Sequence, residues 1–225
     1  MADSYVAIPL EQAIPALGLD GHFEGRTTLD PFVSDTPGKV SPFVVRHYRK
    51  SATVSGDIDM DALVYKENVA GIVVDGDLRL KGSIINWEID TTAAFLWVRG
   101  TLTCDNIVFG SMDLVVSRNV TASGLIVATY NHGHLLIVGN VRAGRVIIDD
   151  DGPSIIDGKV TAKGWCASHN AQVAMRESDW QAEVRPEFHE EFFHPNGFFR
   201  CGNGNVDLVQ ALLAGRDILR EEPQR

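Results

Sequence analysis

Cysteine and basic residues are both scarce in this chain of 225 residues, and each shortage excludes a class of protein. The cysteines are three, Cys104, Cys166 and Cys201, with no CxxC pair, so the sequence supports neither a disulfide framework nor a zinc ribbon. Cys104 and Cys166 follow alternating apolar positions, which predicts buried, unreactive thiols. Lys and Arg number 20 against 30 Asp and Glu, a net charge of −10. We therefore expect no nucleic-acid partner and no anionic membrane surface.

Targeting signals are lacking as well. The N-terminus has no basic region followed by an apolar one, so it does not resemble a secretory signal. Residues 119–141 carry no charge and are long enough to span a bilayer, but apolar and small polar residues alternate on both sides of a central turn. This pattern predicts two strands and a turn, and we expect a cytoplasmic protein.

Glycine, by contrast, is abundant, and it marks an internal repeat. Each repeat has an apolar residue, a spacer, usually Gly, and then alternating apolar residues. The six repeats are Val54–Ile58, Val74–Leu78, Val98–Leu102, Val116–Val120, Ile137–Val141 and Ile156–Val160. Their central positions, 56, 76, 100, 118, 139 and 158, are separated by 20, 24, 18, 21 and 19 residues.

A period this short excludes βαβ units, and no helical pattern connects the strands. Short β-branched strands joined by Gly-containing turns can instead stack as coils. An antiparallel sandwich is the alternative, but it would not require one motif at a fixed phase. The sequence therefore predicts an all-β fold, a single-stranded parallel β-solenoid (β-helix) with about six coils of roughly 20 residues over 51–170.

Helical capping segments are expected at both ends, because exposed strand edges invite aggregation. Residues 1–50 form the predicted N-terminal cap, with a short helix over Leu10–Leu17. Residues 171–225 form an acidic, aromatic-rich segment and a capping helix, which would begin at Asn205 and end at Gly215.

Three further motifs accompany the repeat: Tyr130–Gly133 (YNHG), Asp149–Asp151 and Ala211–Arg220 (ALLAGRDILR). Together with the V-x-G-D-L unit they resemble bacterial β-solenoid proteins related to the bactofilin-like, polymer-forming group. The resemblance covers about residues 53–222. It implies a component of a toxin–immunity locus, in which an immunity protein binds and blocks a toxin. The long segments at both ends depart from a true bactofilin and argue against end-to-end polymerisation.

A candidate partner-binding edge follows from stacking the turns of successive coils. The side chains expected there are Tyr130, Asn131, His132, Asp149, Asp150, Asp151 and His169; from the acidic aromatic segment we add Glu187, Glu190 and Glu191. Stacked carboxylates raise one another's pKa, as in the acid/base pairs of carbohydrate-cleaving β-helices. The alternative is that polar side chains collect in turns because turns face water.

Two metal-like patterns do not support a metal site. Asp57–Asp61 alternates carboxylates with inward-pointing apolar residues, but Ala62 stands where a calcium loop needs Gly. We expect a solvated strand edge there. His189 and His194 lie five residues apart, so they do not share one helical face. We expect no metal, no cofactor and no catalytic residues.

Three functions remain open, in this order. The first is a non-enzymatic binding protein, specifically an immunity protein; the acidic charge favours a basic toxin through electrostatic steering. The second is a self-assembling structural solenoid, which needs an exposed terminal coil. The third is a carbohydrate-active β-helix enzyme using Asp149–Asp151 with His132 and His169.

Overall fold

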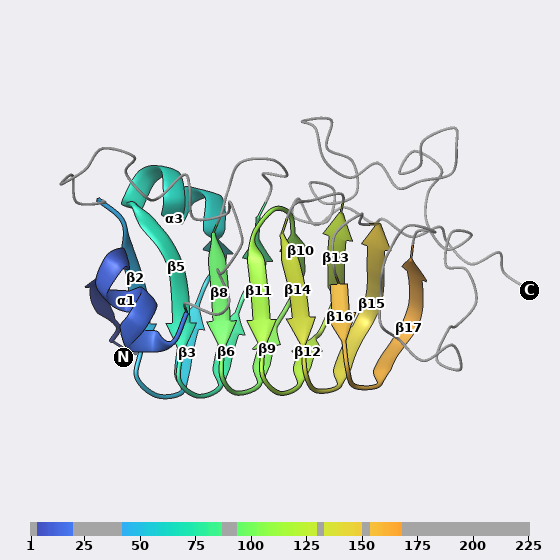
Figure 1. The fold of residues 1–225 in the computed structure, drawn as a ribbon. Helices are drawn as coiled ribbons and strands as arrows, with labels where there is room; N and C mark the ends of the chain where they lie inside the picture. Colours follow the sequence, from blue (N-terminus) through green and yellow to red (C-terminus); the bar gives the residue numbers. More distant parts are fainter. Residues whose placement is uncertain (1–3, 20–41, 87–93, 130–132, 150–153, 168–225) are drawn as a thin grey trace, which may run out of the picture.

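The computed structural model describes residues 4–19, 42–86, 94–129, 133–149 and 154–167. From β2 onward the strands follow a coiled path, and the strands of successive coils pair in parallel (Figure 1). The path from β2 to β16 completes five turns. The predicted parallel β-solenoid is thus confirmed, with about five turns where six coils were expected.

Three faces recur in every coil, one from the seven-stranded sheet and two from the ten-stranded sheet. Face A comprises β2 Val44–Tyr48, β5 Val69–Val74, β8 Phe95–Val98, β11 Asp113–Val116, β14 His134–Ile137 and β16 Ser154–Ile156. Face B comprises β3 Ala52–Ser55, β6 Leu78–Lys81, β9 Leu102–Cys104 and β12 Val120–Ala122. Face C comprises β4 Ile58–Asp59, β7 Ile84–Ile85, β10 Ile107–Phe109 and β13 Leu125–Thr129. The long strands β15 Val141–Asp149 and β17 Val160–Ala167 run through both B and C.

Coil length varies along the solenoid, and the first coil is the longest. On face B, the register partners in successive coils are Ala52, Leu78, Leu102, Val120, Val141 and Val160. The separations between them give coil lengths of 26, 24, 18, 21 and 19 residues. The last four values equal the spacings predicted from the repeat. The first prediction, 20 residues between Gly56 and Gly76, is wrong. Gly56 stacks on Gly82 at the turn between faces B and C, whereas Gly76 stacks beside Ser51 at the turn between A and B.

A helix in the first coil explains that error. Helix α3, Met60–Glu67, connects β4 to β5 and lengthens the coil. Its N-cap is Asp59, whose side chain accepts a hydrogen bond of 2.9 Å from the Ala62 N–H. Asp57 accepts from the Ser83 N–H at 2.7 Å. Asp57 and Asp59 are exposed, as the predicted solvated edge requires, and the carboxylates have further roles, because they terminate a strand, begin a helix and bind the next coil.

At the N-terminal end, β1 Val6–Pro9 pairs antiparallel with β2, and helix α1 follows at Leu10–Leu17, as the sequence predicted. The helix buries Leu10, Ala13 and Leu17, which share one face. It ends at Gly18, whose φ of 65° suits glycine. Strand β2 begins at Val44, so the parallel coils start inside the segment that was expected to be a cap.

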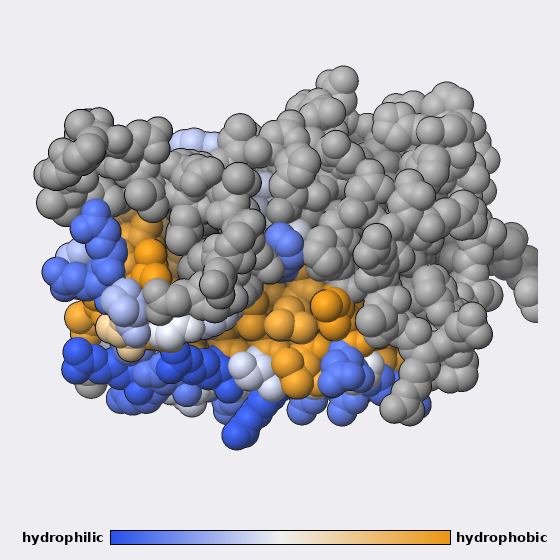
Figure 2. Space-filling model, viewed as in Figure 1, coloured by the Kyte–Doolittle hydropathy of each residue, from blue (hydrophilic) through white to orange (hydrophobic). Residues whose placement is uncertain are grey.

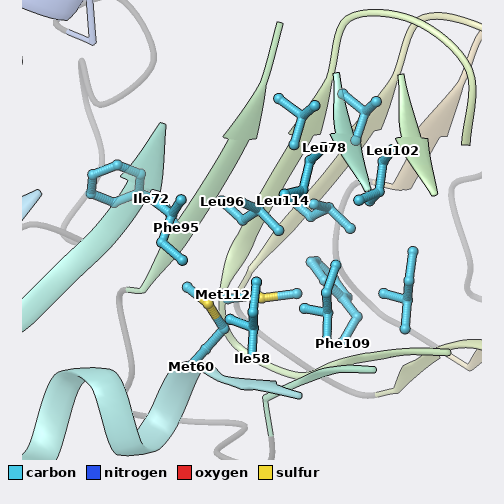
Figure 3. Close-up of a cluster of buried hydrophobic side chains, with 14 of the residues drawn as sticks. Ile58, Met60, Ile72, Leu78, Phe95, Leu96, Leu102, Phe109, Met112 and Leu114 are labelled. Carbon is cyan, nitrogen blue, oxygen red and sulfur yellow. The ribbon is translucent and has the colours of Figure 1, made fainter. Parts of the chain in front are cut away.

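The solenoid interior is a stack of aliphatic side chains. Aligned interior positions carry Ile72, Leu96 and Leu114 from face A, and Leu78 and Leu102 from face B (Figure 3). All five are at most 3% exposed. Period-2 alternation therefore directs one side of each strand inward, as expected for a coil of this kind.

Polar ladders at the turns bind one coil to the next. At the turn between faces A and B, a side-chain oxygen accepts the backbone N–H of the equivalent residue one coil later. The pairs are Ser51 with Asp77 (3.0 Å), Asp77 with Thr101 (2.8 Å), Asn119 with Asn140 (2.9 Å) and Asn140 with Lys159 (2.9 Å). This is the structural role of the polar residue that follows Gly in the repeat. The Gly itself lies against the previous coil: a Cβ on Gly158 would lie 2.3 Å from the Gly139 carbonyl oxygen.

The predicted C-terminal helix after Asn205 and the acidic aromatic segment lie outside the described residues. The helical caps at both ends are therefore not established. In the part of the chain that the structure describes, neither helix is long and apolar enough to cross a membrane.

Candidate functional site

Of the ten partner-binding residues predicted from the sequence, one lies in a described strand. Asp149 is the last residue of β15 and stands in register with Thr129 at the end of β13. Both strands therefore lead into the turn between faces C and A, as the stacking argument expected. The other nine are outside the described residues: Tyr130, Asn131, His132, Asp150, Asp151, His169, Glu187, Glu190 and Glu191.

The same turn carries a described ladder. Asn86 donates from Nδ2 to Asp61 Oδ1 at 2.6 Å, and its Oδ1 accepts the Met112 N–H at 2.8 Å. Asn86 is only 1% exposed. Its side chain thus links three successive coils, and this end of face A is held rigidly.

Face A is apolar on both its inner and its outer side. The aligned outer positions, named here the outer apolar row, are Val73, Trp97, Val115, Leu136 and Ile155. Val73 is fully buried, Trp97 and Leu136 are half-buried, and Ile155 is 40% exposed. Figure 2 shows apolar surface as a band across this side of the molecule, with hydrophilic residues below it.

Helix α1 lies beside the first-coil end of the outer apolar row (Figure 1). Its buried residues belong to the same cluster as Val45 and Val73, and the Leu10 N–H donates to the Phe43 carbonyl oxygen at 3.0 Å. Phe95 lies over Gly71, where a Cβ would come within 2.5 Å of the ring. At the other end, Val138 follows β14 and is 48% exposed. The apolar surface is therefore buried near α1 and opens toward the later coils.

A polar cluster lies at the first-coil margin of face A. Buried His47 contacts Asp75 through Nε2 at 2.8 Å, and Arg99 Nη1 donates to the other oxygen of Asp75 at 3.1 Å. Arg99 also donates to the Leu17 carbonyl oxygen at the end of α1. This cluster ties the helix to the coils, which is a structural role.

A second histidine–carboxylate pair lies beside the turn between faces C and A. Asp113 and His134 are register partners on β11 and β14, and Oδ1 lies 2.9 Å from Nδ1. The Asp113 side chain is 3% exposed and that of His134 is 26% exposed. The buried carboxylate orients an imidazole whose edge reaches solvent, an arrangement that suits a general base or a polar contact at an interface.

The described residues do not complete a catalytic or metal site around this pair. No hydroxyl or thiol among them hydrogen-bonds to His134, and no three His, Cys, Asp or Glu side chains in these ranges could hold a metal. Burial raises the pKa of the Cys104 thiol to about 12, helped by the charge of Asp105. Cys104 is therefore the inert buried thiol that the sequence predicted; the side chain of Cys166 lies outside the described set.

Comparison of the chain with models of protein families, with curated proteins and with solved structures finds no match. The resemblance to bactofilin-like and toxin–immunity proteins therefore remains an expectation, while the β-solenoid itself is established.

Reasoning from sequence missed the outer apolar row and both histidine–carboxylate pairs. A signal was present: the strands Val69–Val74, Phe95–Val98 and Asp113–Val116 are nearly continuous apolar runs. Such runs are typical of strands covered on both faces, whereas those of face B alternate with polar residues, as Leu78–Lys81 does. The difference predicts that face A has a second layer.

Proposed function

We propose that this chain is a non-enzymatic protein-binding β-solenoid whose partner docks on the exposed end of the outer apolar row. The observation that carries the proposal is the course of that row. It is buried beside α1 and continues through Leu136 to Ile155, with Val138 beside it, where apolar side chains are half-exposed. Apolar side chains gathered on a flat, rigid sheet are a common feature of protein-binding surfaces.

The composition of this surface also supports a protein partner. Trp97 is a half-buried aromatic residue within the row, and Trp is enriched among the residues that dominate binding energy. The Asp113–His134 pair supplies a polar group at the margin. An apolar centre with a polar rim is the usual anatomy of an interface.

The finer form of the proposal is an immunity protein that binds and inhibits a cognate bacterial toxin, and it rests on the family resemblance. The net negative charge that favours a basic toxin does not lie on the described part of the chain. The described residues contain 12 Lys and Arg against 11 Asp and Glu, so the acidity resides in the remaining segments of the chain. Electrostatic steering of a basic partner would come from those segments, and adhesion from the outer apolar row.

A tagged pull-down from bacterial lysate tests the proposal with matched variants. Ile155→Asp and Val138→Asp place a charge on the exposed end of the row. Tyr65→Asp is the control, because Tyr65 is 59% exposed on α3 and is not part of the outer apolar row. We expect the unmodified chain and the Tyr65 variant to retain one stoichiometric protein that the other two lose. A partner retained equally by all four chains would refute docking on this row.

Co-expression separates the finer form from the coarser one. If the captured protein is toxic when expressed alone and harmless with this chain, the immunity role is supported. A partner that is harmless when expressed alone leaves a binding protein of another kind and removes the immunity role.

The self-assembling alternative is less well supported. Strand β1 pairs antiparallel with β2 on face A, so a second copy could not extend the parallel coils at that strand. The enzymatic alternative has the oriented His134 in its favour, but the described residues give it no nucleophile.

A further inference from the structure

Face B carries a groove that the proposed protein interface does not use. It has a volume of about 420 Å³ and lies where β12, β15 and β17 run side by side. Its lining consists of Thr121, Ala122, Ser123, Arg142, Ala143, Gly144, Thr161 and Ala162. The groove lining thus provides one guanidinium and three hydroxyls, with no carboxylate, while its Ala122 and Ala143 belong to the solenoid core.

The three polar side chains along its axis are aligned by the coils. Thr121, Arg142 and Thr161 are register partners on successive strands, so they stand about 4.8 Å apart. Alternation along each strand places them opposite the inward residues Val120 and Val141, which are at most 1% exposed. Arg142 therefore stands between two threonines on the outer side of face B.

Two arginines near face A have carboxylate partners. Arg46 pairs with Glu67, and Arg99 pairs with Asp75. Arg142 is exposed and has no carboxylate partner within the described ranges. The groove lining itself contains no carboxylate that would compete for its charge.

We propose that this groove binds a carboxylate-bearing sugar, such as a uronic acid. The planar guanidinium matches a carboxylate in bidentate geometry. Hydroxyls that both donate and accept match the vicinal hydroxyls of a sugar ring. A volume of about 420 Å³ lies within the range of small-molecule sites and holds one or two sugar rings.

The pattern favours a sugar acid over a bare phosphate. A phosphate site draws several donors to one point, commonly at a helix N-terminus or a Gly-rich loop. Here one cation stands between evenly spaced hydroxyls on flat strands. The same chemistry would accept a free sugar acid or one unit of an acidic polysaccharide. The inference is independent of the protein-binding proposal, because it concerns a different face.

Isothermal titration calorimetry at low ionic strength tests it, with sodium glucuronate, tetragalacturonate, glucose and inorganic phosphate as probes. We expect glucuronate to bind, glucose to bind at least tenfold more weakly, and Arg142→Ala to lower glucuronate affinity at least tenfold. Arg118→Ala is the matched control, because it removes the same charge from an exposed turn outside the groove. Thr121→Val, which preserves shape, should lower affinity about three- to tenfold.

The outcomes discriminate among the possible ligands. Equal affinity for glucuronate and tetragalacturonate identifies a free sugar acid as the ligand, and at least tenfold tighter tetragalacturonate binding identifies a polysaccharide. Absence of binding by both sugar acids overturns the proposal. So does unchanged binding in the Arg142 variant, or phosphate binding as tightly as glucuronate.

Discussion

Replacing Asn86 with Ala tests the idea that side-chain ladders hold the coils together. The substitution removes the Nδ2 donor to Asp61 and the Oδ1 acceptor of the Met112 N–H. Asp61 is partly exposed, so water replaces part of the first bond, and about 1 kcal/mol is lost there. Met112 is fully buried, so leaving its N–H without a hydrogen-bond partner costs about 1–3 kcal/mol of folding stability. We expect Asn86→Ala to lower the free energy of unfolding by about 2–4 kcal/mol.

Asn140→Ala provides the matched control. Asn140 also accepts a backbone N–H from the next coil, at 2.9 Å from Lys159, but it is exposed. Water can satisfy that N–H after truncation, so we expect a loss below about 1 kcal/mol. The measurement is urea unfolding of both variants, followed by far-ultraviolet circular dichroism. The reasoning is refuted if the two variants lose equal stability, or if Asn86→Ala remains within about 0.5 kcal/mol of the unmodified chain.

Three further outcomes are expected. Gly158→Ala should destabilise the protein by at least about 1–3 kcal/mol in thermal or urea unfolding, because the new Cβ would meet the Gly139 carbonyl; an unchanged midpoint would contradict this contact. His134→Ala should cost about 1–3 kcal/mol, because the buried Asp113 carboxylate loses its imidazole, while His134→Gln, which keeps a donor, should recover part of the loss. Cys104, studied with the other two cysteines replaced by Ser, should resist a thiol reagent near pH 8 until urea is added, and fast labelling of the native chain would contradict its burial. Because burial raises the pKa of this thiol from 9.0 to about 12, its contribution to stability is complete below about pH 9 and declines as the pH rises toward 12.

The repeat shows which coil spacings periodicity predicts correctly and which one it does not. The predicted spacings are confirmed from Gly76 to Gly158 because each of those coils repeats the same turn at the same phase. The prediction failed at Gly56 because a similar motif occurs at a different turn, and α3 brings the two motifs to an apparent period of 20 residues. Local patterns identify a turn type, but not which turn of the coil it is.

Most contacts of the candidate site could not be predicted from the sequence. His47 and Asp75 are 28 residues apart, and Asp113 and His134 are 21 apart, so both pairs form only when coils stack. The groove around Arg142 likewise needs Thr121 and Thr161 from neighbouring coils. No separation along the chain distinguishes such pairs from chance until the length of each coil is known.

By itself, the sequence determined the solenoid, the position of helix α1 and the burial of Cys104, because alternation and Gly-containing turns are local properties of a strand and its ends. Tertiary structure alone decided which residues meet across coils. The ladder from Asp61 through Asn86 to Met112 and the threonines beside Arg142 depend on register between coils. Register follows from stacking the whole chain, because coils of 18 to 26 residues align their strands only when the extra residues, such as those of α3, lie between strands.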